Sequence, residues 1–237
     1  MKKIILILFF ASMFVQTQVE TRTLNNGNLI LEDVPNVPEE IKKELKGYQN
    51  IRSASFRGFK PDNEGVFIST RFGDVGQLHV VDRPLGMRKQ VTFFDEPIGS
   101  VSVQPNGGLI AFTMDSGGSE NAQIYVMNPE NGRTVLVSDG ESRNGSVLWS
   151  RDGEKIAFGT TRRNGASNDV WVMDYKYPEQ AKMVFASPDG TSWTPSDWSK
   201  DSKKILLQNY ISVTSSRIFI VDTETGESKL VTNKEDS

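Results

Sequence analysis

The feature that most constrains the fold is a pattern that recurs about every 46 residues from residue 53 onward. A short apolar run appears four times, at residues 66–68, 110–112, 156–158 and 205–207. A second apolar run, ending in Asp or Asn, follows each of them at residues 78–82, 124–128, 170–174 and 218–222. Because the two series keep nearly the same interval, they are copies of one structural unit. This period predicts one β-propeller blade of four short strands.

Turn residues and two further strands complete the repeated unit. A hairpin signal lies between the first and second strands of each unit, at Asp62, Asn106, Asp152 and Asp201. The expected fourth strands end at residues 90–92, 136–138, 184–185 and 230–232. Three residues before each hairpin, the innermost strand carries Phe59, Val103, Trp149 and Trp198. We expect this series to pack in the core rather than to form an aromatic platform for sugars.

We therefore predict an all-β fold, a β-propeller of four-stranded antiparallel blades, with about four blades in an incomplete ring. The predicted units are a signal peptide (1–18), a hairpin and helix (19–52) and a partial propeller (53–237), whose blades span about 53–92, 93–138, 139–185 and 186–232. An open arc leaves apolar sheet faces and strand edges uncovered. Either the four blades close on themselves, or further blades follow Ser237.

The N-terminus has the pattern of a leader peptide. Lys2 and Lys3 form a basic start, and residues 4–15 form an apolar run of 12 residues. A membrane-spanning helix needs about 20 apolar residues, so this run is too short to span a bilayer. We interpret it as a secretory signal peptide, and the alternative is a buried N-terminal helix or strand. The expected location is secreted or periplasmic, with no membrane attachment after signal cleavage.

The segment before the repeats combines a hairpin signal with a helix signal. Asn26-Gly27 lies between two short apolar stretches and predicts a tight turn. Pro38 suits the first turn of a helix that continues to about Lys46. Ile41 and Leu45 lie four residues apart on one face of this helix, so we expect them to face inward.

Composition excludes several classes of function. The chain contains no cysteine and one histidine, which leaves no zinc-type ligand cluster, and no Asp-x-Asp-x-Asp-Gly loop indicates calcium. The formal net charge is −3 and the sequence pI is about 5.4, whereas nucleic-acid surfaces are normally basic. We expect no metal, no cofactor and no nucleic-acid partner.

Two levels of similarity identify a family resemblance. The repeated pattern at residues 150–158 and 170–174 resembles the WD40-like repeats of periplasmic Tol-type propellers and of prolyl oligopeptidase (S9) family peptidases. More specific runs resemble the N-terminal half of secreted bacterial S9 peptidases, and these are residues 48–56, 68–73, 77–79, 88–97 and 142–145. The resemblance implies a propeller followed by an α/β-hydrolase domain with a Ser-Asp-His triad. It also implies that the propeller limits access to peptide-sized substrates.

The chain itself lacks the motif that such chemistry requires. A nucleophile elbow has the pattern Gly-x-Ser-x-Gly, and the nearest segments, 117–121 and 140–144, lack the second glycine. His79 occupies the repeat position that Tyr125, Trp171 and Phe219 fill, so we expect a packed blade residue rather than a general base. We therefore predict that this chain is not catalytic by itself.

Four arginines are the candidate site residues. Arg71, Arg162 and Arg163 lie in loops between second and third strands, and Arg143 lies in a connector between blades. In a propeller, both kinds of loop lie on the same face. These arginines are candidates for binding a substrate carboxylate or for pairing with acidic residues of a hydrolase domain. The alternative is that they are solvated surface residues.

The leading hypothesis is the substrate-gating propeller domain of a secreted S9-type serine peptidase acting on peptides, with the catalytic α/β-hydrolase domain outside this chain. The alternative is a stand-alone periplasmic Tol-type propeller that serves as a protein-binding or scaffold module. A sugar-active propeller enzyme ranks below both, because clustered carboxylates at matching blade positions are lacking.

Overall fold

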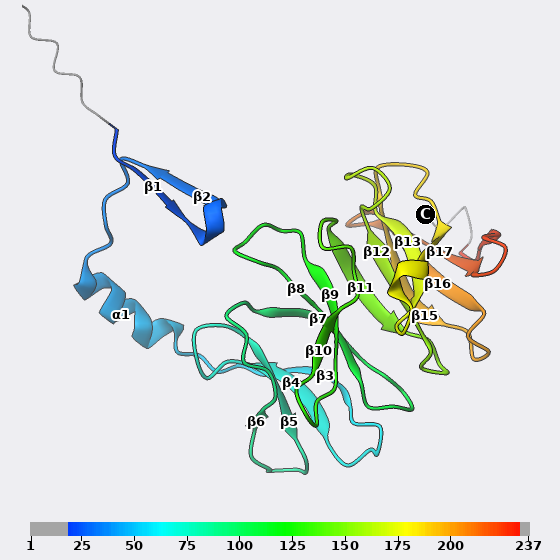
Figure 1. The fold of residues 1–237 in the computed structure, drawn as a ribbon, viewed down its shortest axis with the longest axis horizontal. Coiled ribbons are helices and arrows are strands. Elements are labelled where there is room, and N and C mark those ends of the chain that lie inside the picture. The colour runs from blue at the N-terminus through cyan, green and yellow to red at the C-terminus, as the bar shows by residue number, and fades with distance from the viewer. Residues whose placement is uncertain (1–18, 233–237) are drawn as a thin grey trace, which may run out of the picture.

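The computed structural model describes residues 19–232, which form an N-terminal hairpin, one α-helix and four antiparallel sheets of four strands each (Figure 1). The expected signal peptide at residues 1–18 and the last five residues of the expected propeller lie outside the described residues.

Sheet 1 contains β3 (Ser55–Phe59), β4 (Val66–Thr70), β5 (Gln77–Val81) and β6 (Lys89–Gln90). Sheet 2 contains β7 (Ile98–Val103), β8 (Ile110–Met114), β9 (Gln123–Met127) and β10 (Thr134–Leu136). Sheet 3 contains β11 (Asn144–Trp149), β12 (Lys155–Thr160), β13 (Asp169–Asp174) and β14 (Lys182–Phe185), with a 3₁₀ turn at Pro178–Gln180. Sheet 4 contains β15 (Ser192–Trp198), β16 (Lys204–Ser212), β17 (Ser215–Asp222) and β18 (Ser228–Leu230).

Each sheet is a meander in which strands pair in chain order, and the sheets stand side by side along an arc. The first strands contact one another, β3 with β7, β7 with β11 and β11 with β15, so they form the inner edge of the arc. Sheets 1 and 4 lie at opposite ends of the arc in Figure 1, and the described sheets form no closed ring. The predicted propeller of four-stranded antiparallel blades, in an incomplete ring, is confirmed.

The core consists of the three layers between neighbouring sheets. Alternate residues of a strand point to opposite faces, so every inner sheet contributes to two layers. In sheet 3, Ile156, Phe158 and Met173 pack toward sheet 2, whereas Ala157, Val170 and Val172 pack toward sheet 4. Both faces are buried, which explains the continuous apolar runs of the repeat.

Two tryptophans form hydrogen bonds between neighbouring blades at the inner edge of the arc. Trp149 and Trp198 are each 3% exposed. The indole Nε1 of Trp149 donates to the carbonyl oxygen of Ser102 (3.1 Å), and that of Trp198 donates to the carbonyl oxygen of Leu148 (3.2 Å). Each bond therefore joins an inner strand to the inner strand of the preceding sheet. The expectation that the whole series is core is wrong for Phe59, which is 63% exposed because no preceding sheet covers it.

Removing one of these indole donors should weaken the fold. Trp149→Phe keeps an aromatic ring but removes the indole donor to the Ser102 carbonyl oxygen, and the loss of one such hydrogen bond costs about 0.5–1.5 kcal/mol. Trp171→Phe is the matched control, because the buried Nε1 of Trp171 has no hydrogen-bond partner among the described residues. Urea unfolding followed by circular dichroism should show a larger loss for Trp149→Phe. Equal losses for the two variants would contradict the role of the bond.

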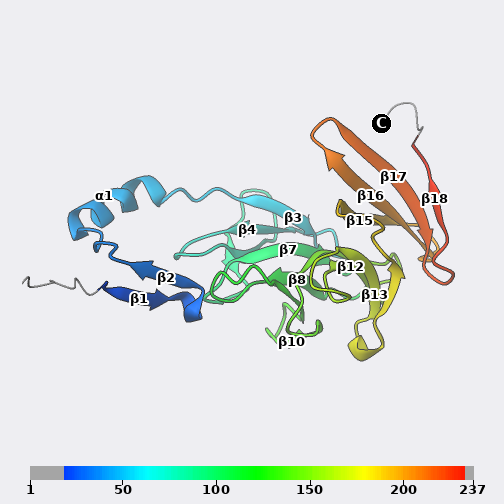
Figure 2. The same cartoon turned by 90° about the horizontal axis from the view of Figure 1, so that it is seen from above.

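The N-terminal segment lies apart from the core. Strands β1 (Thr21–Leu24) and β2 (Leu29–Glu32) form the predicted hairpin, and α1 (Glu39–Gln49) forms the predicted helix. Figure 2 shows α1 standing clear of the sheets. The expectation that Ile41 and Leu45 face inward is wrong, since they are 48% and 43% exposed and no residue of α1 is buried. The helical pattern was sufficient to predict the helix, but the described residues provide no surface for its apolar side.

The only histidine of the chain, His79, is a fully buried blade residue in β5, as predicted. Its Nδ1–H donates to the carbonyl oxygen of Gln77 (3.0 Å), and its Nε2 has no partner within the described part of the chain. The ring of Phe72 covers it edge-on, with centroids 4.8 Å apart. Burial lowers the pKa of His79, the hydrogen bond to Gln77 opposes this effect, and the positive charge of Arg88 lowers the pKa further.

The lowered pKa predicts acid sensitivity of sheet 1. Below pH 6.5, the ordinary pKa of histidine, the unfolded chain binds a proton at His79 that the folded chain does not. Stability should therefore fall with pH in this window, by at most about 1.4 kcal/mol per pH unit for this one group. His79→Phe, which introduces the residue type of Phe219 at the same repeat position, should reduce this dependence. The measurement is the urea midpoint at pH 7.5 and 5.5, and an unchanged pH dependence in the variant would refute the assignment.

Candidate functional site

The loops between second and third strands and the connectors between blades lie on one side of the arc. We call this side the loop face. Topology brings all four candidate arginines to this face, because Arg71 follows β4, Arg162 and Arg163 follow β12, and Arg143 precedes β11. Arg143, Arg162 and Arg163 belong to the same sheet. Arg71 lies two sheets away from them. The arginines therefore form one group of three and one separate residue.

Arg163 is engaged in a structural ion pair. Its Nε and Nη2 donate to the two carboxylate oxygens of Asp169 (2.7 and 2.9 Å), and Asp169 is fully buried at the start of β13. Nη2 also donates to the carbonyl oxygen of Ser187, whose N–H donates to Asp169. The hydrogen bonds with Asp169 raise the pKa of Arg163. This arrangement ties the loop of sheet 3 to the connector that leads to sheet 4.

Arg162 is also engaged within the protein. Its Nε lies 3.6 Å from Oδ2 of Asp139, and its guanidinium carbon lies 5.0 Å from the ring centroid of Trp171. Burial acts to raise the pKa of Asp139, but hydrogen bonds from Ser142 and Glu141 and the charge of Arg162 hold it below the ordinary value. Asp139 therefore remains charged and partly neutralises Arg162.

Arg143 differs from its two neighbours because its charged group is free. Its backbone N–H donates to Oγ1 of Thr161 (3.1 Å), and its carbonyl oxygen accepts from the N–H of Thr161 (3.0 Å). Within residues 19–232, its guanidinium forms no ion pair or side-chain hydrogen bond. The side chain borders a hollow of about 200 Å³ between the starts of β11 and β15.

Arg71 borders a different hollow, of about 270 Å³, between the loop after β4 and the C-terminal end of α1. Lys46, Gln49 and Asn50 line its helical side, and Asp74 lines the loop side. Arg71 forms no ion pair within the described residues. The same hollow nevertheless offers it a carboxylate, from Asp74.

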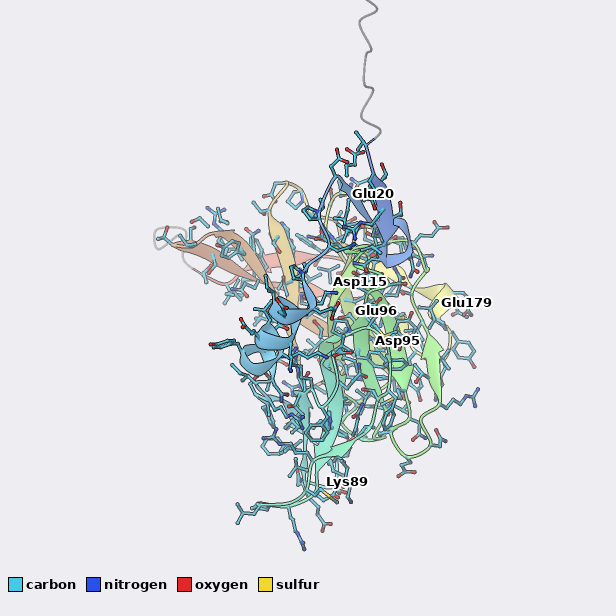
Figure 3. The ribbon with its side chains drawn as sticks, turned by 90° about the vertical axis from the view of Figure 1, so that its left-hand side faces the viewer. Glu20, Lys89, Asp95, Glu96, Asp115 and Glu179 are labelled. Carbon is cyan, nitrogen blue, oxygen red and sulfur yellow. The ribbon has the colours of Figure 1, made fainter. Side chains whose placement is uncertain are left out.

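The loop face also has an acidic side, whose residues were not among the predicted site residues. Figure 3 shows Asp95, Glu96 and Asp115 close together near the middle of the view. Oε1 of Glu96 accepts from the N–H of Gly117 (2.7 Å), and the side chain of Asn28 in the N-terminal hairpin donates to the Gly117 carbonyl oxygen (3.0 Å). The repeat places Glu96 and Asp115 on this face, in a blade connector and a second-to-third strand loop, whereas nothing in the repeat links Asn28 of the hairpin to it.

Hydrogen bonds keep Asp115 ionised. Burial acts to raise its pKa, but the hydroxyl of Ser119 and the N–H groups of Ser116, Ser119 and Glu120 hold it below the ordinary value. The loop face therefore carries carboxylates over sheet 2, and over sheet 3 it carries three arginines, two of which are paired with Asp139 and Asp169. Such a surface is suited to a partner that carries both charges, as a peptide does.

The structure offers no assembled catalytic or metal centre in the part of the chain that it describes. No group of three or more His, Cys, Asp or Glu side chains in residues 19–232 is placed to hold a metal ion. No helix in that range is long and apolar enough to cross a membrane.

Comparison with known proteins assigns the family. The family model described as prolyl oligopeptidase, N-terminal β-propeller domain, matches residues 92–237. The chain belongs to this family. A comparison with curated protein sequences found no significant match.

Solved structures show the same fold at low sequence identity. TolB from Acinetobacter baumannii is 18% identical with a TM-score of 0.61, and the match covers 90% of this chain and 48% of TolB. A prolyl endopeptidase from a study of two such enzymes is 13% identical with a TM-score of 0.60, and the match covers 92% of this chain and 39% of the enzyme. A putative TolB from Agrobacterium tumefaciens is 16% identical with a TM-score of 0.61, with 90% and 79% covered. This propeller chain thus spans about half or less of the first two proteins.

The contrast between Arg163 and Arg162 leads to a stability prediction. Arg163→Gln removes the charge that matches the buried carboxylate of Asp169, whereas Arg162→Gln breaks a longer, more exposed pair. Arg163→Gln should lower the thermal midpoint more and should speed hydrogen exchange at Ser187. Equal midpoints for the two variants would show that the Arg163–Asp169 pair has no special structural role.

Proposed function

We propose that this chain is the substrate-gating propeller domain of a secreted serine peptidase of the prolyl oligopeptidase family, which acts on peptides. The observation that carries the proposal is the family match to the N-terminal propeller domain over residues 92–237. In this proposal the catalytic α/β-hydrolase domain lies outside the chain, because residues 1–237 contain no Gly-x-Ser-x-Gly elbow. The propeller would then select substrates by limiting access.

The loop face is the side on which we place the peptide and the hydrolase domain. It carries free and paired arginines over sheet 3 and carboxylates over sheet 2. The N-terminal segment reaches the same face through the contact of Asn28 with Gly117. Its helix leaves apolar side chains uncovered, among them Tyr48, which is 80% exposed. An exposed apolar surface of this kind supports the presence of a neighbouring domain.

We also propose that the protein is secreted or periplasmic. The support is the basic start at Lys2 and Lys3 followed by the 12-residue apolar run.

The proposal predicts that the chain alone does not hydrolyse peptides. Expressed with its leader in a bacterial host, it should be recovered from the periplasm, shortened at its N-terminus. This product should not cleave chromogenic peptide substrates, and a fluorophosphonate probe should not label it above background, because the family's nucleophile is not in the chain. Labelling of a serine in this chain would overturn the proposal. Sequencing of the transcript beyond codon 237 should find a reading frame that continues into Gly-x-Ser-x-Gly.

A stand-alone Tol-type propeller that serves as a binding or scaffold module is the second candidate. The observation that favours it is the putative TolB from Agrobacterium tumefaciens, of which the match covers 79%. A transcript without a hydrolase segment, together with a monodisperse chain that unfolds cooperatively, would favour this candidate.

A further inference from the structure

Among the three arginines that sheet 3 carries on the loop face, only Arg143 has a charge that the described part of the protein does not match. Asp169 binds Arg163 through two hydrogen bonds, and Asp139 lies beside Arg162. The hollow that Arg143 borders has no acidic residue in its lining. A guanidinium with no internal carboxylate is available to one from outside.

The backbone around Arg143 is fixed, so the arginine is presented from a defined position. Thr161 holds its backbone N–H and its carbonyl oxygen. The next residue, Asn144, is 6% exposed, and its side-chain amide donates to the carbonyl oxygens of Ala122 (3.0 Å) and Ser142 (2.7 Å). On the protein side, the ordering cost of binding therefore falls on the arginine side chain rather than on its backbone.

The shape of the hollow follows from two glycines and one tryptophan. Gly145 and Gly159 pair across β11 and β12, and neither carries a side chain that would fill the space. Trp193 borders the hollow but is only 4% exposed, and its ring is fixed in the core because Nε1 donates to Asp189 (3.1 Å) and the ring packs against Phe185 and Phe219. The hydroxyls of Ser192 and Thr194 and the amide of Asn168 also line the hollow.

The size of the hollow limits what it can accept. Its volume is about 200 Å³, which is room for roughly six waters at ~30 Å³ each. This space suits one residue of a peptide rather than a folded element. The polar residues of the lining, Ser192, Thr194 and Asn168, can satisfy polar atoms of such a residue.

We propose that this hollow is a carboxylate-binding subsite in which Arg143 forms the charge-assisted hydrogen bonds. The ligand is a peptide carboxylate, from either the C-terminus or an acidic side chain. Arg162 and Arg163 are excluded as the primary ligands because Asp139 and Asp169 already match them. The subsite deepens the proposed peptide-facing role of the loop face and rests on it.

The test uses the full chain and three acetylated tetrapeptides in isothermal titration calorimetry. The first peptide ends in a free carboxylate, the second has the same sequence with a C-terminal amide, and the third is an amide with Glu as its last residue. We expect the free acid to bind and the plain amide to bind at least about tenfold more weakly, because the amide cannot form charge-assisted hydrogen bonds with the guanidinium of Arg143. Binding of the third peptide would identify an acidic side chain as a second source of the carboxylate.

Variants link the binding to Arg143. Arg143→Gln should weaken binding of the free acid by about tenfold or more, and Arg143→Lys should retain part of it. Arg133→Gln is the matched control, since Arg133 lies in the turn between β9 and β10, at the end of sheet 2 that is opposite to the loop face. The affinity of this variant for the free acid should be unchanged. Each variant is first shown to keep the thermal midpoint of the parent chain.

Three results would overturn the subsite: no binding by any peptide, equal binding of the acid and the amide, or full binding by Arg143→Gln. None of these results decides the proposed peptidase function, which is tested by fluorophosphonate labelling and by the sequence of the transcript. Conversely, labelling of a serine in this chain would remove the proposed function while carboxylate binding could still be measured.

Discussion

Face-to-face packing of neighbouring sheets is the interaction on which the rest of this structure depends. A sheet of four short strands has two faces, and the central sheets here bury both of them under apolar side chains. Each core layer is built by two sheets together. Stability is therefore shared between neighbours, as in repeat proteins. The indole bonds of Trp149 and Trp198 fix the inner strands of adjacent sheets at the point where the sheets are closest.

The same dependence explains why one repeat position carries such different residues. His79, Tyr125, Trp171 and Phe219 are equivalent in the repeat, and each packs against an aromatic or cationic neighbour. His79 lies under Phe72, Tyr125 stacks on Phe112, and Arg162 lies over Trp171. The position requires a flat side chain with a large contact area, and this requirement is met by residues of different polarity. The burial of the only histidine is thus a consequence of the repeat rather than a sign of catalysis.

The sequence predicted the structural features that recur in every blade and missed individual side-chain contacts and bulges. Strand positions, blade number and the location of the four arginines on one face follow from the period. Register shifts in all four inner strands were missed, including the one between Gly145 and Leu148, because a bulge changes pairing without changing the apolar pattern. The period places Asp139 and Glu96 in blade connectors and Asp115 in a second-to-third strand loop of the same face, but it does not show which side chains on that face contact one another. Spacing could not distinguish Arg143 from Arg163, since only contacts reveal which charge is already matched.

The N-terminal helix shows how a disagreement between sequence and structure becomes informative. Alternation of Ile41 and Leu45 with charged residues is a pattern that normally reflects burial of one face. The helix forms, yet both side chains are exposed, and a helix of 11 residues is marginal in water without tertiary contacts. The exposed apolar face of α1 fits the neighbouring domain proposed above. The same reasoning applies to Phe59, whose equivalents Trp149 and Trp198 are buried by a preceding sheet: the repeat specifies a contact, and an exposed member of the series marks the place where that contact is unfilled.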